Sequence, residues 1–191
     1  MPPQAKLTRE QILDGALALV RREGIDALNA RALAGELGCS TQPIFSNFPS
    51  MEALRRELLG RGEALYAAKL QEVLEEKTYP PYKAYGIGYI RFAREEKHLF
   101  RWLFMRDRTG EDQSPTGEWT QVAEQIHRST GMGLEEAGAF HLRMWIFVHG
   151  IATMIATGYL DFTEAQASAM LTEVYQAAQT QRERREDHAC H

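Results

Sequence analysis

The residues best suited to recognise a partner molecule lie between positions 40 and 47. Gln42 carries an amide that donates and accepts at once, which matches the edge of adenine in the major groove of DNA. Thr41 adds a hydroxyl for base edges and a methyl group for thymine. Such side chains read DNA when the first turn of a helix presents them outward. The residues that we expect to meet DNA are Arg31, Ser40, Thr41, Gln42, Pro43, Phe45 and Asn47.

Residues 29–48, NARALAGELGCSTQPIFSNF, have the spacing of two short helices joined by a tight turn. Ala34 is small enough to let the second helix cross closely over the first, and Gly38 tolerates the positive φ of the turn. Ser40 is expected to cap the second helix, with Pro43 in its first turn. Arg31 lies in the first turn of the preceding helix, where it is either a phosphate contact or a solvent-exposed charge.

A second group of candidates is aromatic and lies in the later part of the chain. His141, Trp145 and His149 recur at helical spacing, so they share one face of a helix. An apolar pocket with a few polar groups is typical of small-molecule sites, whereas ordinary aromatic core is the alternative for each residue. His149 alone fits a core histidine. The candidate ligand-binding residues are Tyr85, Tyr89, Phe92, Trp102, Met105, Trp119, His141, Trp145 and His149.

Helix-capping signals divide the chain into elements. Thr8 with Gln11, and Thr163 with Gln166, each fit a capping box, which predicts helices over residues 8–23 and 163–185. Ser50 begins a helix to about residue 76, in which Gly60 and Gly62 indicate either a bend or close packing against a neighbouring helix. The remaining predicted helices are the two within residues 29–48 and those over 82–94, 97–106, 118–130 and 134–158, with a polar loop at 107–117. The expected fold is all-α, with about nine helices.

Residues 144–160 form a run of seventeen residues without Asp, Glu, Lys or Arg. A membrane span needs about 20 apolar residues, so we expect a helix buried within a protein assembly and no membrane partner. Gly150, Thr153 and Thr157 form a strip of small residues on which another helix could pack.

The charge and cysteine content of the chain bear on DNA binding and on the cellular compartment. The chain has a net charge of −4, so it is no general polycation. Residues 1–62 carry eight Lys/Arg and seven Asp/Glu, whereas the remainder carries fourteen and nineteen. Phosphate contacts dominate nucleic-acid affinity, so this small asymmetry is a weak signal for DNA binding. Cys39 and Cys190 indicate no disulfide framework, and the N-terminus lacks an apolar signal segment, which favours the cytoplasm.

Enzyme chemistry has no support in the sequence. We find no nucleophile–base arrangement, no paired carboxylates in an apolar setting and no phosphate loop after a strand. No cofactor and no metal are expected. His188, Cys190 and His191 are possible metal ligands on the tail, but three ligands on a chain end make a weak site.

Residues 8–60 resemble the DNA-binding domain of the TetR family of transcriptional repressors, on the stretch ILDGALALVRREGIDALNARALAGELGCSTQPIFSNFPSMEAL. The resemblance implies a homodimeric, ligand-responsive repressor that reads a pseudo-palindromic operator. The aromatic candidates of the later part of the chain indicate a small, largely hydrophobic effector that releases it. We expect a DNA-binding domain over residues 1–50 and a ligand-binding and dimerisation domain over 51–191, linked by the helix at 50–76.

Three positions depart from the family pattern. Phe45 replaces a tyrosine, Asn47 a histidine and Met51 a lysine, which together remove phosphate-binding groups. Arg55 and Arg56 are candidates to replace them. The alternative function is therefore a helical small-molecule-binding dimer of the same fold with weak or lost DNA binding.

The segments EEKHLFRWLFM and WIFVHGIATMIATGYL resemble the C-terminal domain of one TetR subgroup, which has a Trp/His-Gly region on the penultimate helix. This resemblance implies that the last two helices pair with their copies in a four-helix bundle. The expected dimer-interface residues are Gly150, Thr153, Thr157, Met170, Leu171, Val174, Tyr175 and Ala178.

Overall fold

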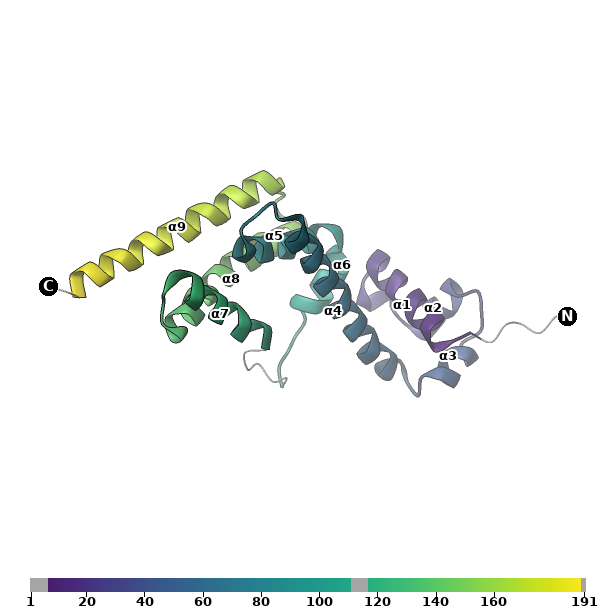
Figure 1. The fold of residues 1–191 in the computed structure, drawn as a ribbon. Coiled ribbons are helices and arrows are strands. Elements are labelled where there is room, and N and C mark those ends of the chain that lie inside the picture. Colours follow the sequence, from purple (N-terminus) through teal and green to yellow (C-terminus); the bar gives the residue numbers. More distant parts are fainter. Residues whose placement is uncertain (1–6, 111–116, 190–191) are drawn as a thin grey trace. The chain divides into compact units, whose positions relative to one another are not determined.

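The computed structural model describes residues 7–110 and 117–189, and every regular element within them is helical (Figure 1). The all-α prediction is confirmed for this part of the chain. The short 3₁₀ helix η1 had no sequence signal. The elements are α1 (Arg9–Glu23), η1 (Ile25–Ala27), α2 (Ala30–Glu36), α3 (Gln42–Asn47), α4 (Met51–Glu76), α5 (Pro81–Glu95), α6 (Lys97–Phe104), α7 (Gly117–Thr130), α8 (Leu134–Thr157) and α9 (Glu164–Ala189).

Side-chain caps fix most of the predicted helix starts. The Thr8 hydroxyl accepts from Gln11 N at 3.2 Å while Thr8 N donates to the Gln11 side chain at 2.9 Å, so the capping box is present. The Asn29 side chain accepts from the backbone N–H groups of residues 31 and 32. Ser50 accepts from the backbone N–H of residue 53 at 3.1 Å. Each cap satisfies backbone donors that the helix itself leaves unpaired.

The start of α3 differs from the prediction. Ser40 does not cap this helix, because α3 begins at Gln42 with Thr41 as the preceding residue and no side-chain cap. Thr41 has helical backbone angles (φ −72°, ψ −15°) instead of the extended conformation from which a side-chain cap is made. The N–H groups of the first turn of α3 therefore receive no side-chain cap.

The chain divides into two compact units. Unit 1 comprises Met1–Lys69 and Glu95–Arg106, and unit 2 comprises Leu70–Arg94 and Asp107–His191. The division falls within α4, and α6 groups with the N-terminal helices. The functional boundary expected at residue 50 stays a prediction.

Unit 1 has a core formed by α1, α2, α3, the first part of α4 and α6. Ile44 and Phe48 are almost completely buried. A Cβ added to Gly62 would lie 3.1 Å from Leu99 Cδ1 and 3.2 Å from Leu103 Cδ2, so α4 and α6 pack closely at this glycine. Gly60 has open space beside it, and α4 continues through both glycines. Close packing therefore accounts for Gly62, and no bend is needed.

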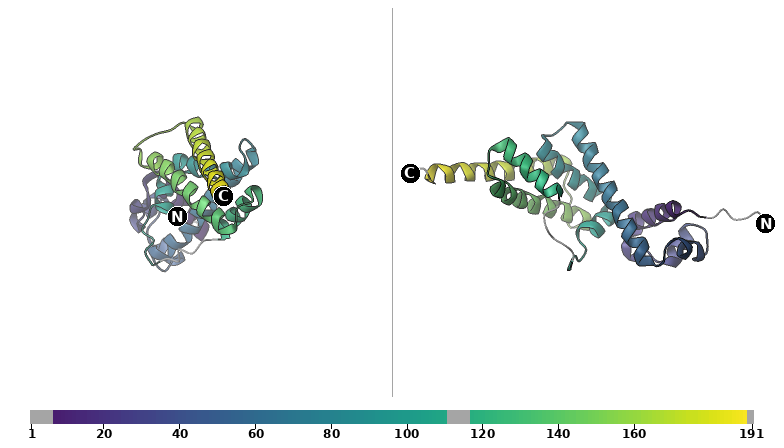
Figure 2. Two further views of the ribbon diagram at one scale, coloured as in Figure 1. Left: turned by 90° about the vertical axis from the view of Figure 1, so that its left-hand side faces the viewer. Right: turned by 60° about the horizontal axis from the view of Figure 1, so that its bottom comes forward.

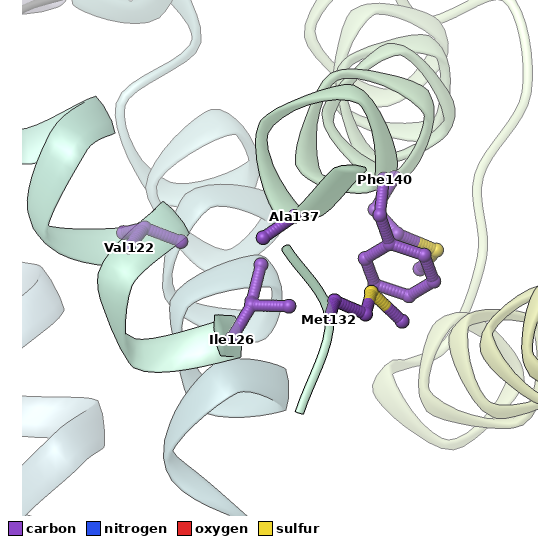
Figure 3. Close-up of a cluster of buried hydrophobic side chains, with 6 residues drawn as sticks. Val122, Ile126, Met132, Ala137 and Phe140 are labelled. Atoms are coloured by element: carbon purple, nitrogen blue, oxygen red, sulfur yellow. The ribbon is translucent and has the colours of Figure 1, made fainter. Parts of the chain in front are cut away.

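The core of unit 2 is centred on α7 and α8, which lie side by side (Figure 2). Their buried side chains interlock with Met132 from the connecting segment (Figure 3). The partly buried Tyr82, Val174, Tyr175 and Ala178 pack against this cluster from α5 and α9. The cluster itself consists of Val122, Ile126, Met132, Ala137, Phe140 and Met144.

Helix α8 contains most of the uncharged run seen in the sequence. Its 24 residues are long and apolar enough to cross a membrane by length and composition alone, and 39% of its most apolar window is buried in the fold. One side packs into the unit 2 core through residues such as Phe140 and Ile151, whereas the other exposes Leu142 and Ile146. A core helix of a protein passes the same test, and the burial of one side favours that interpretation.

Candidate functional site

The turn between α2 and α3 has the geometry that its sequence predicts. Gly38 has a φ of +62°, and the N–H of Cys39 donates to the carbonyl of Ala34 at 2.9 Å. Ala34 is 5% exposed and Ile44 is fully buried, so the two helices meet through small and apolar side chains. This crossing sets which side chains of α3 remain outside the core.

Four of the seven predicted DNA-binding residues are exposed on the surface of this helix pair. Arg31 and Gln42 are exposed, and Phe45 is 49% exposed. Ser40 is also exposed, whereas Thr41 and Pro43 are half-buried. The exposed surface is thus an amide beside a flat apolar ring, with a cation on the preceding helix.

Asn47 has a structural role within unit 1. Its side-chain amide donates to the carbonyl of Pro43 at 2.8 Å and reaches the carbonyl of Leu7 at 3.4 Å. These bonds tie the end of α3 to the segment before α1. The Asn47 amide is therefore occupied by its own chain.

Most cations of unit 1 are engaged by its own residues. The Arg55 guanidinium donates to the carbonyl of Leu28 at 2.7 Å. Arg31 and Arg56 are exposed, and no ion pair joins either of them to another described residue. The ion pairs of unit 1 include Arg9 with Glu57, Arg21 with Glu96, Arg22 with Glu23 and Glu36, Arg61 with Glu10 and Asp14, and Lys69 with Glu95.

Unit 2 contains two tyrosine–histidine pairs that join α5 to α8. The Tyr82 hydroxyl lies 3.2 Å from His141 Nδ1, and the Tyr89 hydroxyl lies 2.9 Å from His149 Nδ1. Burial raises the pKa of both tyrosines and lowers the pKa of both histidines, to about 4 for His141. All four side chains are consequently uncharged near neutral pH.

Two tryptophans extend these pairs into a ring cluster. The ring centroids of Trp119, on α7, and His141 are 4.3 Å apart. The ring of Trp145 stacks on that of His149, with 4.9 Å between the centroids and 12° between the planes. Trp119 and Trp145 meet edge-on at 6.5 Å. We call Tyr82, Tyr89, Trp119, His141, Trp145 and His149 the ring cluster.

The structure therefore brings together five of the nine predicted ligand-binding residues. Phe92 is fully buried and Tyr85 is half-buried on α5. Trp102 and Met105 belong to unit 1. Tyr82 was missed as a site residue, although its position seven residues before Tyr89 places both on one face of a helix.

The predicted dimer-interface residues fall into two environments. Thr153 and Thr157 lie with Gly150 on the side of α8 that also exposes Leu142 and Ile146. A Cβ at Gly150 would meet no atom within 4 Å. This side of α8 has no partner among the described residues that would cover its apolar side chains.

The α9 residues of the predicted interface pack within one chain. Leu171 is 4% exposed, and its Cδ1 would lie 3.2 Å from a Cβ at Gly86 on α5. Val174, Tyr175 and Ala178 pack against the unit 2 cluster, and Met170 is half-buried. Arg143 and Arg184 flank an open groove of about 620 Å³ between α8 and α9, which Val174 and Ala178 help to line.

No three His, Cys, Asp or Glu side chains come together as metal ligands in the described part of the chain. The three tail residues considered above, His188, Cys190 and His191, lie outside the residues whose side chains are described.

Two family models match the sequence. Residues 12–58 match the bacterial regulatory proteins of the tetR family, and residues 82–183 match the tetracyclin repressor-like C-terminal domain. The first match covers α2, α3 and the turn between them. The second covers the helices that carry the ring cluster.

Individual relatives agree with these matches. An uncharacterised HTH-type transcriptional regulator of Mycobacterium tuberculosis is 27% identical over 188 residues, covering 96% of this chain and 85% of that protein. A second uncharacterised HTH-type regulator, from Bacillus subtilis, is 20% identical over 158 residues, covering 82% and 83%. The solved structure of a protein of unknown function from Rhodococcus sp. RHA1 superposes with a TM-score of 0.69 at 22% identity, covering 92% of this chain and 97% of that one. That likeness shows the fold.

Proposed function

Because the C-terminal match alone spans over half of its length, the chain belongs to the TetR family of DNA-binding transcriptional regulators, and we propose that it is a ligand-released repressor. In this proposal a cytoplasmic homodimer reads a pseudo-palindromic operator, and a small, largely hydrophobic effector releases it.

The exposure of Gln42 in the first turn of α3 carries the DNA-binding proposal. An α3 placed in the major groove would present this amide to an adenine edge, while the exposed Phe45 ring would contact a thymine methyl or a sugar. Arg31 and Arg56 would bind backbone phosphates. Asn47 takes no direct part, since its amide already holds two carbonyls of unit 1.

The uncovered side of α8 supports dimerisation. Leu142 is 46% exposed and Ile146 is 59% exposed, and the small residues Gly150, Thr153 and Thr157 continue the same side of the helix. A second α8 could approach closely over these small residues and bury both apolar side chains. On α9 the contact would come from its exposed face, because Leu171 and its inward neighbours are used within the chain.

Release by an effector requires that the effector bind the DNA-free conformation more tightly than the DNA-bound one. The ring cluster of unit 2 supports an effector site there, because it joins three helices through uncharged polar groups and aromatic faces. This is the kind of surface that small hydrophobic ligands use.

Fluorescence anisotropy with DNA flanking the protein's own gene tests the DNA-binding proposal. The wild type should bind that DNA more tightly than a scrambled duplex of the same composition. Gln42→Ala should lose about 1–3 kcal/mol of this preference, because one bidentate base contact is removed. Gln71→Ala, on α4 in unit 2, is the matched control and should keep it. Equal affinity of the wild type for both duplexes would count against the proposal.

The ion pairs of unit 1 favour a second candidate function, because they leave few arginines to bind phosphate. If Arg31 and Arg56 contact no phosphate, the chain is a helical small-molecule-binding dimer with weak DNA binding. The salt dependence of DNA affinity separates the two functions, because it counts the phosphates that the protein contacts.

A further inference from the structure

The two tyrosine–histidine pairs of the ring cluster repeat along the same pair of helices. Tyr82 and Tyr89 are seven residues apart on α5, and His141 and His149 are eight apart on α8, so each pair lies about two turns from the other. Both contacts involve Nδ1 of the imidazole. The repeated geometry places both histidines in the same hydrogen-bonding arrangement.

Burial keeps both partners of each pair uncharged, because it raises the pKa of the tyrosines and lowers the pKa of the histidines. A neutral phenol can donate to Nδ1 of a neutral imidazole, and we take this direction for the Tyr82–His141 pair. A neutral imidazole that accepts at Nδ1 carries its proton on Nε2, so the ring of His141 then has an N–H donor on its far side.

Of the two histidines, His141 is the one whose Nε2–H donor a bound molecule can use. Its hydrogen bond to a described residue is the one to Tyr82, and the ring is only half-buried. Burial lowers the pKa of His141 to about 4, so the Nε2–H donor is uncharged at neutral pH. An acceptor on a bound molecule would satisfy this donor.

An accessible aromatic face lies one helical turn from this donor. Trp145 is four residues after His141 on α8, and the residue is 38% exposed although its ring stacks on His149. Trp119 approaches both His141 and Trp145, which gives the area a second aromatic wall. Side chains one turn apart on a helix are neighbours, so one or two fused rings can reach both groups.

We propose that the ring cluster binds a planar aromatic molecule carrying a carboxylate or carbonyl, with the oxygen on His141 Nε2–H and the ring against Trp145. This proposal deepens the proposed function, on which it rests, by naming the chemical class of the effector. A cationic aromatic amine gains an attraction to the tryptophan faces but finds no acceptor on His141, whose Nδ1 is used by Tyr82. The cluster therefore selects for an acceptor on the ligand.

Isothermal titration of the full-length protein at neutral pH tests the polarity of the site with two probes of one shape. 2-Naphthoate should bind at least about tenfold more tightly than 2-naphthylmethylammonium, because an unmatched polar group at a partly buried site costs about 1–3 kcal/mol. Equal or reversed affinities would overturn the proposal. So would the absence of naphthoate binding at about 1 mM, the weakest affinity expected for such a contact.

Two substitutions of His141 distinguish its Nε2–H donor from the hydrogen bond that its Nδ1 makes with Tyr82. In His141→Asn the side-chain oxygen can still accept from Tyr82 but no donor remains at the Nε2 position, so naphthoate affinity should fall about tenfold. In His141→Gln the amide N–H reaches the Nε2 position, and most of the affinity should return. Equal losses in both variants would show a merely structural role for His141 and would overturn the proposal.

Two further variants locate the ring contact. Trp145→Leu, at an exposed position, should weaken naphthoate binding about tenfold because a stacking face is lost. His98→Asn, which replaces a histidine of unit 1, is the control and should bind naphthoate as the wild type does. Unchanged binding in Trp145→Leu would overturn the assignment.

The outcome is separable from that of the DNA-binding proposal when anisotropy is measured on the same samples. Sequence-specific DNA binding without naphthoate binding would overturn this inference and leave the regulator intact. Selective naphthoate binding without sequence-specific DNA binding would support the ligand class and overturn the repressor.

Discussion

The salt dependence of DNA binding can be predicted from the ion pairs of unit 1. Arg9, Arg21, Arg22 and Arg61 each pair with carboxylates of the same unit, and Arg55 holds a backbone carbonyl. These cations are already neutralised or engaged by the fold. Arg31 and Arg56 are the described arginines of the N-terminal helices that remain for phosphate.

The expected slope follows from counterion release. Two arginines in each subunit give four phosphate contacts in a dimer, and each contributes about −0.9 to the slope of log K against log salt. The wild-type slope should therefore be about −3 to −4. Substituting Arg31 by Gln removes two contacts per dimer and should reduce the slope to about −2. Arg31→Gln with Arg56→Gln should bring it close to zero.

Anisotropy titrations between about 50 and 200 mM salt measure these slopes over a range where counterion release dominates. Arg22→Gln is the matched control, because this exposed arginine already pairs with Glu23 and Glu36 and should leave the slope unchanged. A slope near −3 to −4 that survives the double substitution would refute the reasoning. A wild-type slope of only about −1 to −2 would favour the alternative of a binding protein with weak DNA affinity.

Three further predictions concern stability, each with a control in the same protein. Gly38→Ala should lower the free energy of unfolding by about 1 kcal/mol, because the φ of Gly38 is +62°. Gly35→Ala, within helix α2, should raise it by up to about 1 kcal/mol. Urea unfolding measures both changes, and equal effects would contradict the turn geometry. Gly62→Ala should lower the free energy of unfolding by about 1 kcal/mol, because the added methyl group crowds α6. Gly60→Ala should raise it, because this position faces open space. A loss of stability in both variants would indicate a hinge at these glycines. The pKa of His141 is lowered from 6.5 to about 4, so its stabilising contribution is full above pH 6.5 and is lost as the pH falls toward 4. Between about pH 7.5 and 4.5, the free energy of unfolding of the wild type should fall by roughly 1–2 kcal/mol more than that of His141→Asn, after allowance for solvent screening. Parallel plots of unfolding free energy against pH for the two proteins would refute this.

Helix starts were readable from the sequence wherever the cap is local. Thr8, Asn29, Ser50 and Thr163 each bond a backbone N–H within the next three residues, so the signal and the structure share one short segment. Ser40 has the same side-chain chemistry, but Thr41 after it is already helical, and no composition rule reveals that. Local patterns predict caps well only when the backbone before the helix is extended.

Contacts between distant residues were beyond the sequence. The spacing of His141 and His149 placed them on one face, as the helical period requires, but their tyrosine partners lie 59 and 60 residues earlier. Tyr82 was therefore missed although Tyr89 was named. The pairing of Arg21 with Glu96 spans 75 residues and could not be anticipated either.

Apolar patterns on α9 were ambiguous for a related reason. A residue such as Leu171 is apolar whether it packs on its own chain or on a partner subunit, because both surfaces exclude water. The structure places Leu171 against α5 of the same chain. Only the exposure of Leu142 and Ile146 on α8 distinguishes a side that a second subunit could cover.

The most direct test of the central claim is selection of bound DNA from a random library by the full-length wild type, followed by sequencing. A dimer that reads base edges through Gln42 should enrich one motif with two-fold symmetry, and Gln42→Ala should lose preference at one base pair in each half-site. Recovery of sequences without a shared motif would contradict the claim that this helix pair reads DNA.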